Sequence, residues 1–518
     1  MRLNPTGLSS HAALWVILGV GALLRLATYL AATPLFVDEA ALALNLLNRS
    51  YAGLLAPLSF DQAGPVGFLF AERFMLSVLG SGELALRLVP VAAGIASLPL
   101  FLLLANRTGT RLSRPIACAL FAVAPTLVYF AGIAKQYTLD VLVAIVLYLL
   151  VLDATGELRP ARRLAVFSLA GAVAVWFSHP SIFVLAGILA VQLLSLAKQR
   201  SGKGAGGLLL FHAAWLGSFL TLYLVNLSRA AQSDYLRAYW HAHFAPFPPG
   251  GLADLQWYGS RFLGLFKIPL GLSVLIGLGA LVFLYGAIVL YRRAPRTVLL
   301  LLAPLLMAGG ASALSRYPFE ERFLLFFAPA LALFMGEGIA ALFDYRLARV
   351  PLLGGATAAL LIGGPLALSL REIPYEISDV SALGHHVQSH RRAGDVLYLH
   401  CESYATWTYY DQRLGFSREM TVVVGDSLRS TSDYLGEVER LRAHDRVWVL
   451  FGHVRSVGGY SDDLKLLLRL DVVGERLDEK KAGSSGGVYL YDLAAGLPLP
   501  AAARPAARRP CAIPSGLP

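Results

Sequence analysis

The sequence predicts a polytopic α-helical membrane protein that carries a C-terminal extracytoplasmic α/β domain. The composition is the first reason, because 56% of the 518 residues are hydrophobic, 15% are charged and the mean hydropathy is +0.61. This balance excludes an ordinary soluble domain. The second reason is that apolar runs of membrane-spanning length recur over the first 370 residues. The third is a change of hydrophobic period near Ile377, where short β-rich runs begin to alternate with helical stretches.

The apolar runs predict about eleven transmembrane helices. The first follows a basic residue and has no small-residue cleavage signal, so we interpret it as an uncleaved helix. Together the runs form a membrane domain over residues 1–370. The predicted spans are 12–32, 84–105, 115–131, 138–154, 164–178, 181–197, 206–226, 270–291, 297–314, 323–343 and 351–370.

Basic residues occur in short clusters in every second connection between these runs. The formal net charge of +11 therefore reflects cytoplasmic loops, and this patterning argues against nucleic-acid binding. By the positive-inside rule, the N-terminus is cytoplasmic and everything after about residue 371 is extracytoplasmic. The clusters are Arg107, Arg111 and Arg114; Arg159, Arg162 and Arg163; Lys198, Arg200 and Lys203; Arg292, Arg293 and Arg296; and Arg346 and Arg349.

Two long connections on the external side are predicted to have structure of their own. The first, about 33–83, contains GPVGFLFAERFMLSVLG, which is too short to span and is expected to form an interfacial helix. The second, about 227–269, is dense in aromatic residues, His and Pro. We expect it to fold over the membrane face, because aromatic side chains favour the headgroup level.

The region 371–495 is predicted to be a small α/β domain with a mainly parallel sheet. Helix-like stretches (VSALGHHVQSHRRAG, SYATWTYYDQRL and SDYLGEVERLRAH) alternate there with short β-rich runs (DVLYLH, TVVVG, RVWVLFGH and GVYLYDL). Its first strand is not followed by a Gly-rich phosphate fingerprint, so nucleotide binding has little support there. The Pro/Ala/Arg-biased tail 496–518 is predicted to be disordered. The three cysteines, Cys118, Cys401 and Cys511, are far apart and imply neither a zinc site nor a disulfide framework.

Two adjacent carboxylates, Asp38 and Glu39, lie in TPLFVDEAALALNLLNRSY directly after the first span. In a helix their side chains diverge by about 100°, so one faces a site while the other faces a neighbour. The alternative is a helix N-terminus whose acids complement the helix dipole.

The next external turn, FAGIAKQYTLDVLVA, places Lys135, Tyr137 and Asp140 within six positions. Asp140 begins an apolar span, where an ionisable group is costly and suggests function. Lys135 is a compact charge suited to phosphate. The alternative is a snorkelling lysine that pairs with Asp140.

A later external turn, SRYPFEERFLLFFAPAL, holds Arg316 and Arg322. The positive-inside rule disfavours arginines in external loops, so a role is expected for these two. The guanidinium of Arg322 offers a planar fork to phosphate oxygens. His179, in the short turn WFSHPSIF, is either a substrate contact or a helix-capping residue before Pro180.

These motifs and their common side resemble the GT-C superfamily of integral-membrane glycosyltransferases. The branch most similar contains the protein O-mannosyltransferases and the lipid A aminoarabinose transferases, within which the chain resembles bacterial enzymes that use polyprenyl-phosphate sugars. The resemblance covers most of residues 10–345 and rests on VDEA, FDQAGPVGFLFAERF, GSGELALRLVPVAAG, AKQYTLDVL and RYPFEERFLLFFAPAL.

The resemblance implies a GT-C fold and an inverting transfer of a hexosyl or pentosyl group from a lipid-linked donor. Asp38 matches the family's first-loop acid, which takes the acceptor proton or organises a metal, and Asp140 matches the second-loop acid. Lys135, Tyr137 and Arg322 fall where donor-phosphate contacts are expected. The aminoarabinose transferases carry a Lys-Pro-Pro in the first loop, where this chain has Ala63-Gly64-Pro65 instead, which leaves Asp61 as a weak substrate-binding candidate.

The expected activity is therefore a glycosyltransferase of the cell envelope in the bacterial inner membrane. Its acceptor is a hydroxyl of a glycolipid, polysaccharide or protein, and its cofactor requirement is open, with a divalent metal as one option. The alternatives are a lipid or solute transporter and a noncatalytic membrane scaffold. A transporter predicts charges at mid-membrane depth, whereas the charges here collect at external helix ends.

Overall fold

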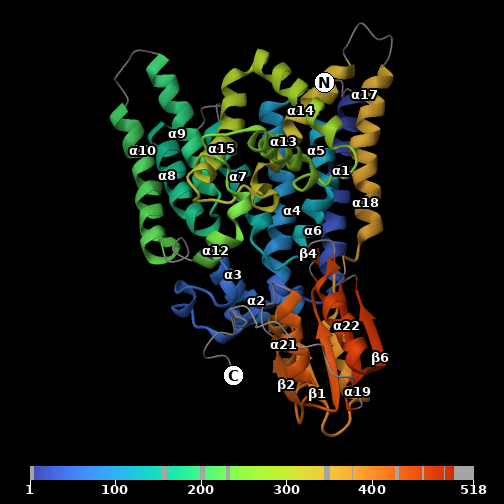
Figure 1. Cartoon of the computed structure of the whole chain (residues 1–518). Coiled ribbons are helices and arrows are strands. Elements are labelled where there is room, and N and C mark those ends of the chain that lie inside the picture. Colours follow the sequence, from blue (N-terminus) through green and yellow to red (C-terminus); the bar gives the residue numbers. More distant parts are fainter. Residues whose placement is uncertain are drawn as a thin grey trace. The chain divides into compact units, whose positions relative to one another are not determined.

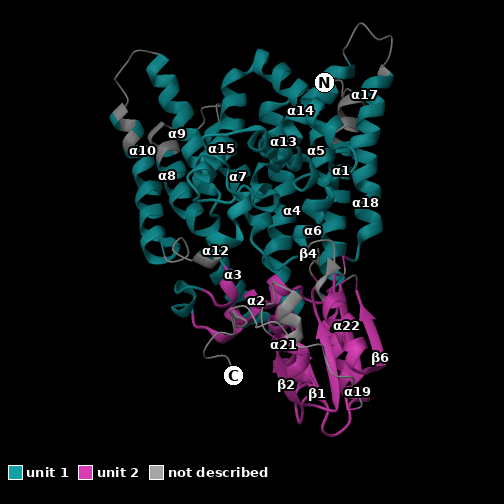
Figure 2. Ribbon diagram, viewed as in Figure 1, with its two compact units in different colours: residues 1–31, 51–57, 63–374 teal, residues 32–50, 58–62, 375–518 magenta. Residues whose placement is uncertain are grey.

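The computed structural model describes residues 5–494 except 153–159, 199–204, 229–233, 344–350, 376, 426–430, 455, 458–459 and 484. The tail 496–518, predicted to be disordered, lies outside the described residues. The chain divides into two compact units, coloured separately in Figure 2. Unit 1 comprises residues 1–31, 51–57 and 63–374, and unit 2 comprises residues 32–50, 58–62 and 375–518.

Unit 1 is a bundle of helices joined by short helical connections (Figure 1). Its long helices are α1 (Pro5–Leu30), α4 (Glu83–Thr108), α7 (Tyr137–Leu152), α8 (Pro160–Phe177), α9 (Ser181–Lys198), α10 (Ala205–Leu222), α14 (Ile276–Arg293), α15 (Pro295–Ala313) and α16 (Ala328–Phe343). The remaining elements are η1 (Gly53–Leu55), α3 (Val66–Leu79), α5 (Ser113–Val123), α6 (Pro125–Ala131), η3 (Tyr223–Leu227), α12 (Asp234–Tyr239), η4 (His241–His243), α13 (Leu252–Lys267), η5 (Glu321–Phe327), α17 (Pro351–Ala358), η6 (Ala359–Gly363) and α18 (Gly364–Glu372).

Every predicted span has a helical counterpart in unit 1. Within the described residues, eight helices are long and apolar enough to cross a membrane, and the bent pair 113–131 makes a ninth. The predicted spans 138–154 and 164–178 correspond to two shorter apolar helices, Tyr137–Leu152 and Ala165–Phe177. The predicted polytopic architecture is therefore confirmed.

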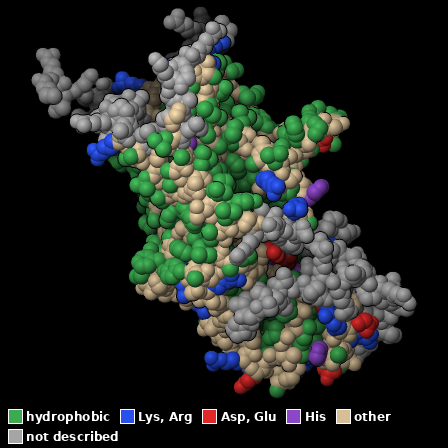
Figure 3. Space-filling view, turned by 90° about the vertical axis from the view of Figure 1, so that its left-hand side faces the viewer, with side chains coloured by type: hydrophobic (Ala, Val, Ile, Leu, Met, Phe, Trp, Pro, Cys, Tyr) green, Lys and Arg blue, Asp and Glu red, His purple; other side chains and the backbone are tan. Residues whose placement is uncertain are grey.

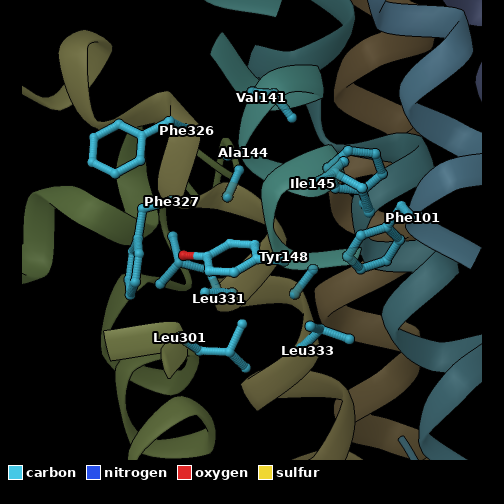
Figure 4. Close-up of a cluster of buried hydrophobic side chains, with 14 of the residues drawn as sticks. Phe101, Val141, Ala144, Ile145, Tyr148, Leu301, Phe326, Phe327, Leu331 and Leu333 are labelled. Atoms are coloured by element: carbon cyan, nitrogen blue, oxygen red, sulfur yellow. The ribbon is translucent and has the colours of Figure 1, made fainter. Parts of the chain in front are cut away.

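The core of unit 1 lies around α16, because nearly all residues of this helix and the second half of η5 are buried. Glycines allow this helix to approach its neighbour α14, since neither Gly286 nor Gly338 leaves room for a Cβ atom against the facing backbone. Tyr148 of α7 packs among Phe327, Leu331 and other apolar side chains (Figure 4). On the outside, large apolar residues such as Leu23 face outward, and hydrophobic side chains predominate over the helical unit in Figure 3.

A break between α5 and α6 is the main irregularity of the bundle. The two helices are bent by 49° at Ala124, because Pro125 has no N–H to donate to the carbonyl of Phe121. The guanidinium of Arg25 donates to Ala122 O at 2.8 Å and to Phe121 O at 3.3 Å. The hydroxyl of Ser369 donates to Val123 O at 3.1 Å. Side chains of α1 and α18 thus satisfy the carbonyls at the break, as a bilayer requires.

Two of the predicted cytoplasmic basic loops meet at one end of unit 1. Arg293 pairs with the buried Glu337 at 3.0 Å and donates to Thr108 O at 2.7 Å. Glu337 also accepts from the hydroxyl of Ser113 at 2.6 Å. This network links α14, α16 and the α4–α5 turn. The turn after α4 and the end of α14 therefore lie at the same end of unit 1, which is where the predicted alternation of basic loops puts them. The clusters near 159–163, 198–203 and 346–349 lie wholly or partly outside the described residues.

Unit 2 is an α/β domain whose five-stranded sheet has the order β2-β1-β3-β7-β6. Its core is formed by apolar residues such as Val447, Val449, Leu466 and Leu470. Its strands are β1 (Val396–Leu399), β2 (Thr421–Val424), β3 (Arg446–Phe451), β6 (Glu475–Ala482) and β7 (Gly486–Asp492), with a separate pair β4 (Ser456–Val457) and β5 (Tyr460–Ser461). Its helices are α2 (Val37–Asn48), η2 (Ser59–Asp61), α19 (Val380–His390), η7 (Cys401–Ser403), α20 (Tyr404–Leu414), α21 (Thr431–Leu441) and α22 (Asp462–Val473).

The prediction of a mainly parallel sheet is wrong in its second half. The strands β2, β1 and β3 pair in parallel, but β7 is antiparallel to both β3 and β6. The strand β6, with the sequence ERLDEKKA, was not predicted, because its side chains are mostly exposed and show no hydrophobic alternation. Charged residues are typical of edge strands, where they oppose pairing with another chain.

The cysteines add a feature that the sequence did not indicate. The sequence implied no disulfide framework, and in the structure Cys401 is disulfide-bonded while Cys118 is a free, buried thiol.

Arg25→Met is expected to lower the free energy of unfolding by about 2 kcal/mol or more, because each buried carbonyl left without a donor costs about 1–3 kcal/mol. Removal of the buried charge offsets part of this loss. The measurement is detergent-induced unfolding of the purified protein, with Leu23→Met, which changes a residue that is 66% exposed, as the control. Equal stability of the two variants would contradict the role assigned to Arg25.

Candidate functional site

The turn between α6 and α7 positions three of the predicted site residues in unit 1. Lys135, Tyr137 and Asp140 are all buried, with 7%, 6% and 4% of their surface exposed. The ring of Tyr137 packs edge-on against Phe130, with 4.7 Å between centroids. The hydroxyl of Thr138 donates to Pro90 O at 2.8 Å, which fixes the start of α7 to α4.

Several buried polar atoms in this region have no hydrogen-bond partner within the described residues. They are Gln136 Oε1 and Asp140 Oδ1 at the start of α7, and Ser178 Oγ and His179 Nε2 in the turn between α8 and α9. Ser178 lies beside Asp140. Even so, neither Ser178 Oγ nor Asp140 Oδ1 has a hydrogen-bond partner among the described residues. A buried polar group without a partner costs about 1–3 kcal/mol, and such groups are rare in folded proteins. The cluster therefore has the character of a site prepared for a polar ligand.

The segment that precedes η5 reaches the same cluster through Tyr317. The phenol interacts electrostatically with Asp140 and Tyr137, and its hydroxyl donates to Phe323 O at 3.0 Å. Its ring packs edge-on against Phe183 of α9, with 4.7 Å between centroids. Burial, followed by the nearby Asp140, raises the pKa of Tyr317, so the side chain is a neutral phenol and a donor.

Arg322 lies beside this segment, with its guanidinium 5.2 Å from the ring centre of Trp240 and 5.3 Å from that of Phe323. These are distances at which a cation interacts with an aromatic face. Trp240 belongs to the long aromatic connection, which folds back here as Phe319 N–H donates to His243 O at 2.8 Å. The two rings therefore hold a cationic group next to the Tyr317 segment.

Ionisable side chains near Arg322 form a cluster, because Arg322 interacts electrostatically with both His243 and Glu320. Glu320 contacts His243 at 3.0 Å and Arg261 at 3.1 Å, and Arg261 also reaches Glu321 at 3.5 Å. Burial, followed by the charge of Arg261, lowers the pKa of His243, so its contact with Glu320 near neutral pH is a hydrogen bond from a neutral ring. Burial, followed by the charge of Glu321, raises the pKa of Glu320.

The predicted acids of the first loop belong to unit 2. Asp38 is half-buried in the first turn of α2, and Glu39 is 1% exposed. The Glu39 Oε2 atom accepts the Phe36 N–H at 3.1 Å, so this acid caps the N-terminus of α2. The position in the first turn is also compatible with the alternative that the acids complement the helix dipole. Asp61 is exposed and has φ of 51°, in the left-handed region.

The helix that carries Asp38 is held by other parts of unit 2. The Leu35 N–H donates to Tyr410 Oη at 2.8 Å, and the ring of Phe36 packs edge-on against His453 with 4.9 Å between centroids. Asn45 exchanges hydrogen bonds with the backbone of Ser59, at 3.1 and 2.8 Å.

Unit 1 thus brings together Tyr137, Asp140 and the segment that leads to Arg322. Arg316 is exposed and stays a sequence prediction. Sequence reasoning noted Tyr317 in its motif but did not single out several other residues of the cluster, of which the most important are Gln136, Ser178, Trp240, His243 and Arg261. The rings of Tyr317 and Trp240 both lie against Phe323, with centroid distances of 6.0 and 5.1 Å, and only the structure shows this shared packing. Within the described residues, the predicted acids do not form a group of three close metal ligands, so we derive no step through a metal.

The fold of the chain is shared with solved membrane proteins. ArnT from Cupriavidus metallidurans matches in the apo state with a TM-score of 0.53 at 13% identity, over 94% of this chain and 99% of that chain. The structure of the same protein bound to undecaprenyl phosphate gives a TM-score of 0.51 with the same identity and coverage.

The oligosaccharyltransferase AglB from Archaeoglobus fulgidus, in complex with an inhibitory peptide and a dolichol-phosphate, is also similar. Its TM-score is 0.52 at 12% identity, over 94% of this chain and 74% of that chain. No protein-family model matches the sequence, and neither does any curated protein. The particular fold is the one seen in ArnT and AglB, which confirms the predicted resemblance.

Acid is expected to destabilise the protein partly through His179. Burial lowers the pKa of His179 from 6.5 to about 4, so the unfolded chain binds a proton more readily than the folded one. The contribution is fully present above the unfolded pKa and is lost as the pH falls from about 6.5 towards 4.

Between pH 7 and pH 5 this loss amounts to about 2 kcal/mol. His179→Gln is therefore expected to show a smaller drop in unfolding free energy over this interval than the wild type. Thermal or chemical unfolding of both proteins at the two pH values checks this. An identical drop in both would show that His179 is not the titrating group.

Proposed function

We propose that this protein is an inverting glycosyltransferase that moves a sugar from a polyprenyl-phosphate donor to a hydroxyl acceptor. The observation that carries the proposal is the cluster of unsatisfied buried polar atoms around Asp140 and Ser178, in the unit that also buries Lys135. Sugar hydroxyls and phosphate oxygens are the kinds of group that such atoms hydrogen-bond. The GT-C fold supports the proposal, because its neighbour ArnT was solved with undecaprenyl phosphate and AglB with a dolichol-phosphate.

The donor is proposed to bind with its phosphate near the cationic side chains of unit 1. Lys135 is buried, so its charge acts in an environment that screens it weakly. Arg322 is held against Trp240 and Phe323, which limits the conformational freedom lost on binding. Both cations would stabilise the negative charge that develops on the leaving phosphate.

The sugar is proposed to be bound by the neutral and acidic groups of the cluster. Gln136 Oε1 and Asp140 Oδ1 accept hydrogen bonds from sugar hydroxyls, and the Ser178 hydroxyl donates or accepts. Tyr137 and Phe323 present rings nearby, with 6.4 Å between their centroids.

The transfer is proposed to proceed as a single displacement. Asp38 accepts the proton of the acceptor hydroxyl while its oxygen attacks the anomeric carbon. The bond between the anomeric carbon and the phosphate oxygen breaks at the same time. The electron pair stays with the polyprenyl phosphate, and the anomeric configuration inverts. Glu39, Asp61 and Arg316 have no assigned step.

The site is proposed to face the outside of the cytoplasmic membrane. The positive-inside pattern supports this orientation, and so does the disulfide at Cys401, because disulfides persist in oxidising compartments. The acceptor is a glycolipid, polysaccharide or protein of the envelope.

Asp38→Asn is expected to lower transfer by about 10²–10⁴-fold, the usual contribution of a general base. We would delete the gene in its host, complement with wild type or Asp38→Asn at equal membrane abundance, and compare envelope lipids, polysaccharides and glycoproteins by mass spectrometry. A sugar mass that returns with wild type and stays absent with Asp38→Asn supports transfer and identifies the product.

If Asp38→Asn restores every product that wild type restores, Asp38 is not the base. If deletion changes the location of a lipid or solute but no sugar-bearing product, the transporter alternative replaces the transferase.

Lys135→Met is expected to weaken donor use more than Lys267→Met, a control at an exposed lysine of α13. Loss of a buried phosphate contact costs about 1.5–3 kcal/mol, which is roughly 10- to 150-fold in kcat/KM for the donor. Transfer rates in proteoliposomes at varied donor concentration give this ratio. Equal rates in the two variants would remove Lys135 from the donor site.

A further inference from the structure

Three potential metal ligands converge on one face of unit 2. His386 and His390 lie four residues apart on α19, so their side chains project from the same side of the helix. Asp478 on β6 completes the group, and its Oδ2 atom lies 2.9 Å from His386 Nε2. One ligand atom from each residue lies within 4.8 Å of the other two.

The surroundings orient these side chains. His390 Nδ1 lies 2.9 Å from the backbone oxygen of His386, a contact that places the proton on Nδ1 and leaves Nε2 as the ligand atom. A carbonyl that accepts from the second ring nitrogen is the usual support of a metal-binding histidine. The ring of Trp448 packs edge-on against His386, with 5.9 Å between centroids.

The strand β6 is irregular directly before Asp478. The register of β6 against β7 shifts between Arg476 and Asp478. Such an irregularity changes the direction of the side chains that follow it. The strand lies at the edge of the sheet, so Asp478 is 30% exposed and open to ions from solution.

We propose that His386, His390 and Asp478 form a binding site for a divalent transition metal of the Zn²⁺ type. Two imidazole nitrogens and one carboxylate oxygen are ligands that Zn²⁺ accepts, with a fourth position left for water. The ion would join α19 to the edge strand β6. This site lies in the α/β domain and takes no part in the transfer chemistry proposed above.

The test is zinc binding by the full-length protein in detergent, purified with a histidine-free tag and treated with a chelator. Titration calorimetry is expected to show about one equivalent of Zn²⁺, and Zn²⁺ is expected to raise the melting temperature, whereas Mg²⁺ has no such effect. His390→Ala and Asp478→Asn are each expected to weaken binding by at least about tenfold and to remove the thermal shift.

The matched control is His385→Ala, since His385 is adjacent on the same helix but packs against Phe416 instead. His390→Ala separates a metal site from a plain ion pair, because it leaves the His386–Asp478 contact in place. It also removes an exposed side chain, so folding is not at risk. Wild-type protein without a zinc-dependent shift, or His390→Ala with wild-type affinity, would overturn the proposal. Neither result bears on the transferase activity, which is measured separately.

Discussion

The constraint on which unit 1 depends is that no backbone carbonyl inside a bilayer can rely on water for a donor. The break at Pro125 frees carbonyls that a continuous helix would satisfy. Arg25 and Ser369 supply the missing donors from two other helices. Because these bonds hold the bend, α6 leaves the axis of α5, and the turn that follows it carries Lys135 and leads to Asp140. A packing requirement in the membrane thus determines where the candidate site is built.

The same constraint gives meaning to the atoms that lack partners. The fold supplies a buried guanidinium to satisfy the carbonyls at the break, yet among the residues that the structure describes Asp140 Oδ1 and Ser178 Oγ have no hydrogen-bond partner. Unsatisfied groups of this kind reduce stability, so their concentration in one cluster indicates a ligand that completes them. Tyr317 and the aromatic rings that hold Arg322 extend the cluster towards a cation.

Much of the fold could be predicted, because apolar length and turn residues are local signals. The spans, the helices α19, α20 and α21 of unit 2 and four of its five main strands follow from them, whereas α22 was not predicted. The long-range features could not be predicted in this way. Nothing near Arg25 indicates that its partners are carbonyls almost a hundred residues away, and the charged sequence of β6 resembles a loop. At the site, the motif residues Asp140 and Arg322 were visible in the sequence, whereas Ser178 and Trp240 become candidates only through packing.

The first-loop acids belong to unit 2, and this gives the α/β domain a possible part in catalysis. The helix α2 is held by Tyr410, His453 and the 58–62 segment, so the half-buried position of Asp38 depends on residues more than 300 positions later. Composition gives no signal for this association. If Asp38 is the base, the domain contributes to catalysis by holding that carboxylate. Removing the whole domain would therefore abolish transfer, and only substitutions that leave the α2 contacts intact can test whether the domain has any other role.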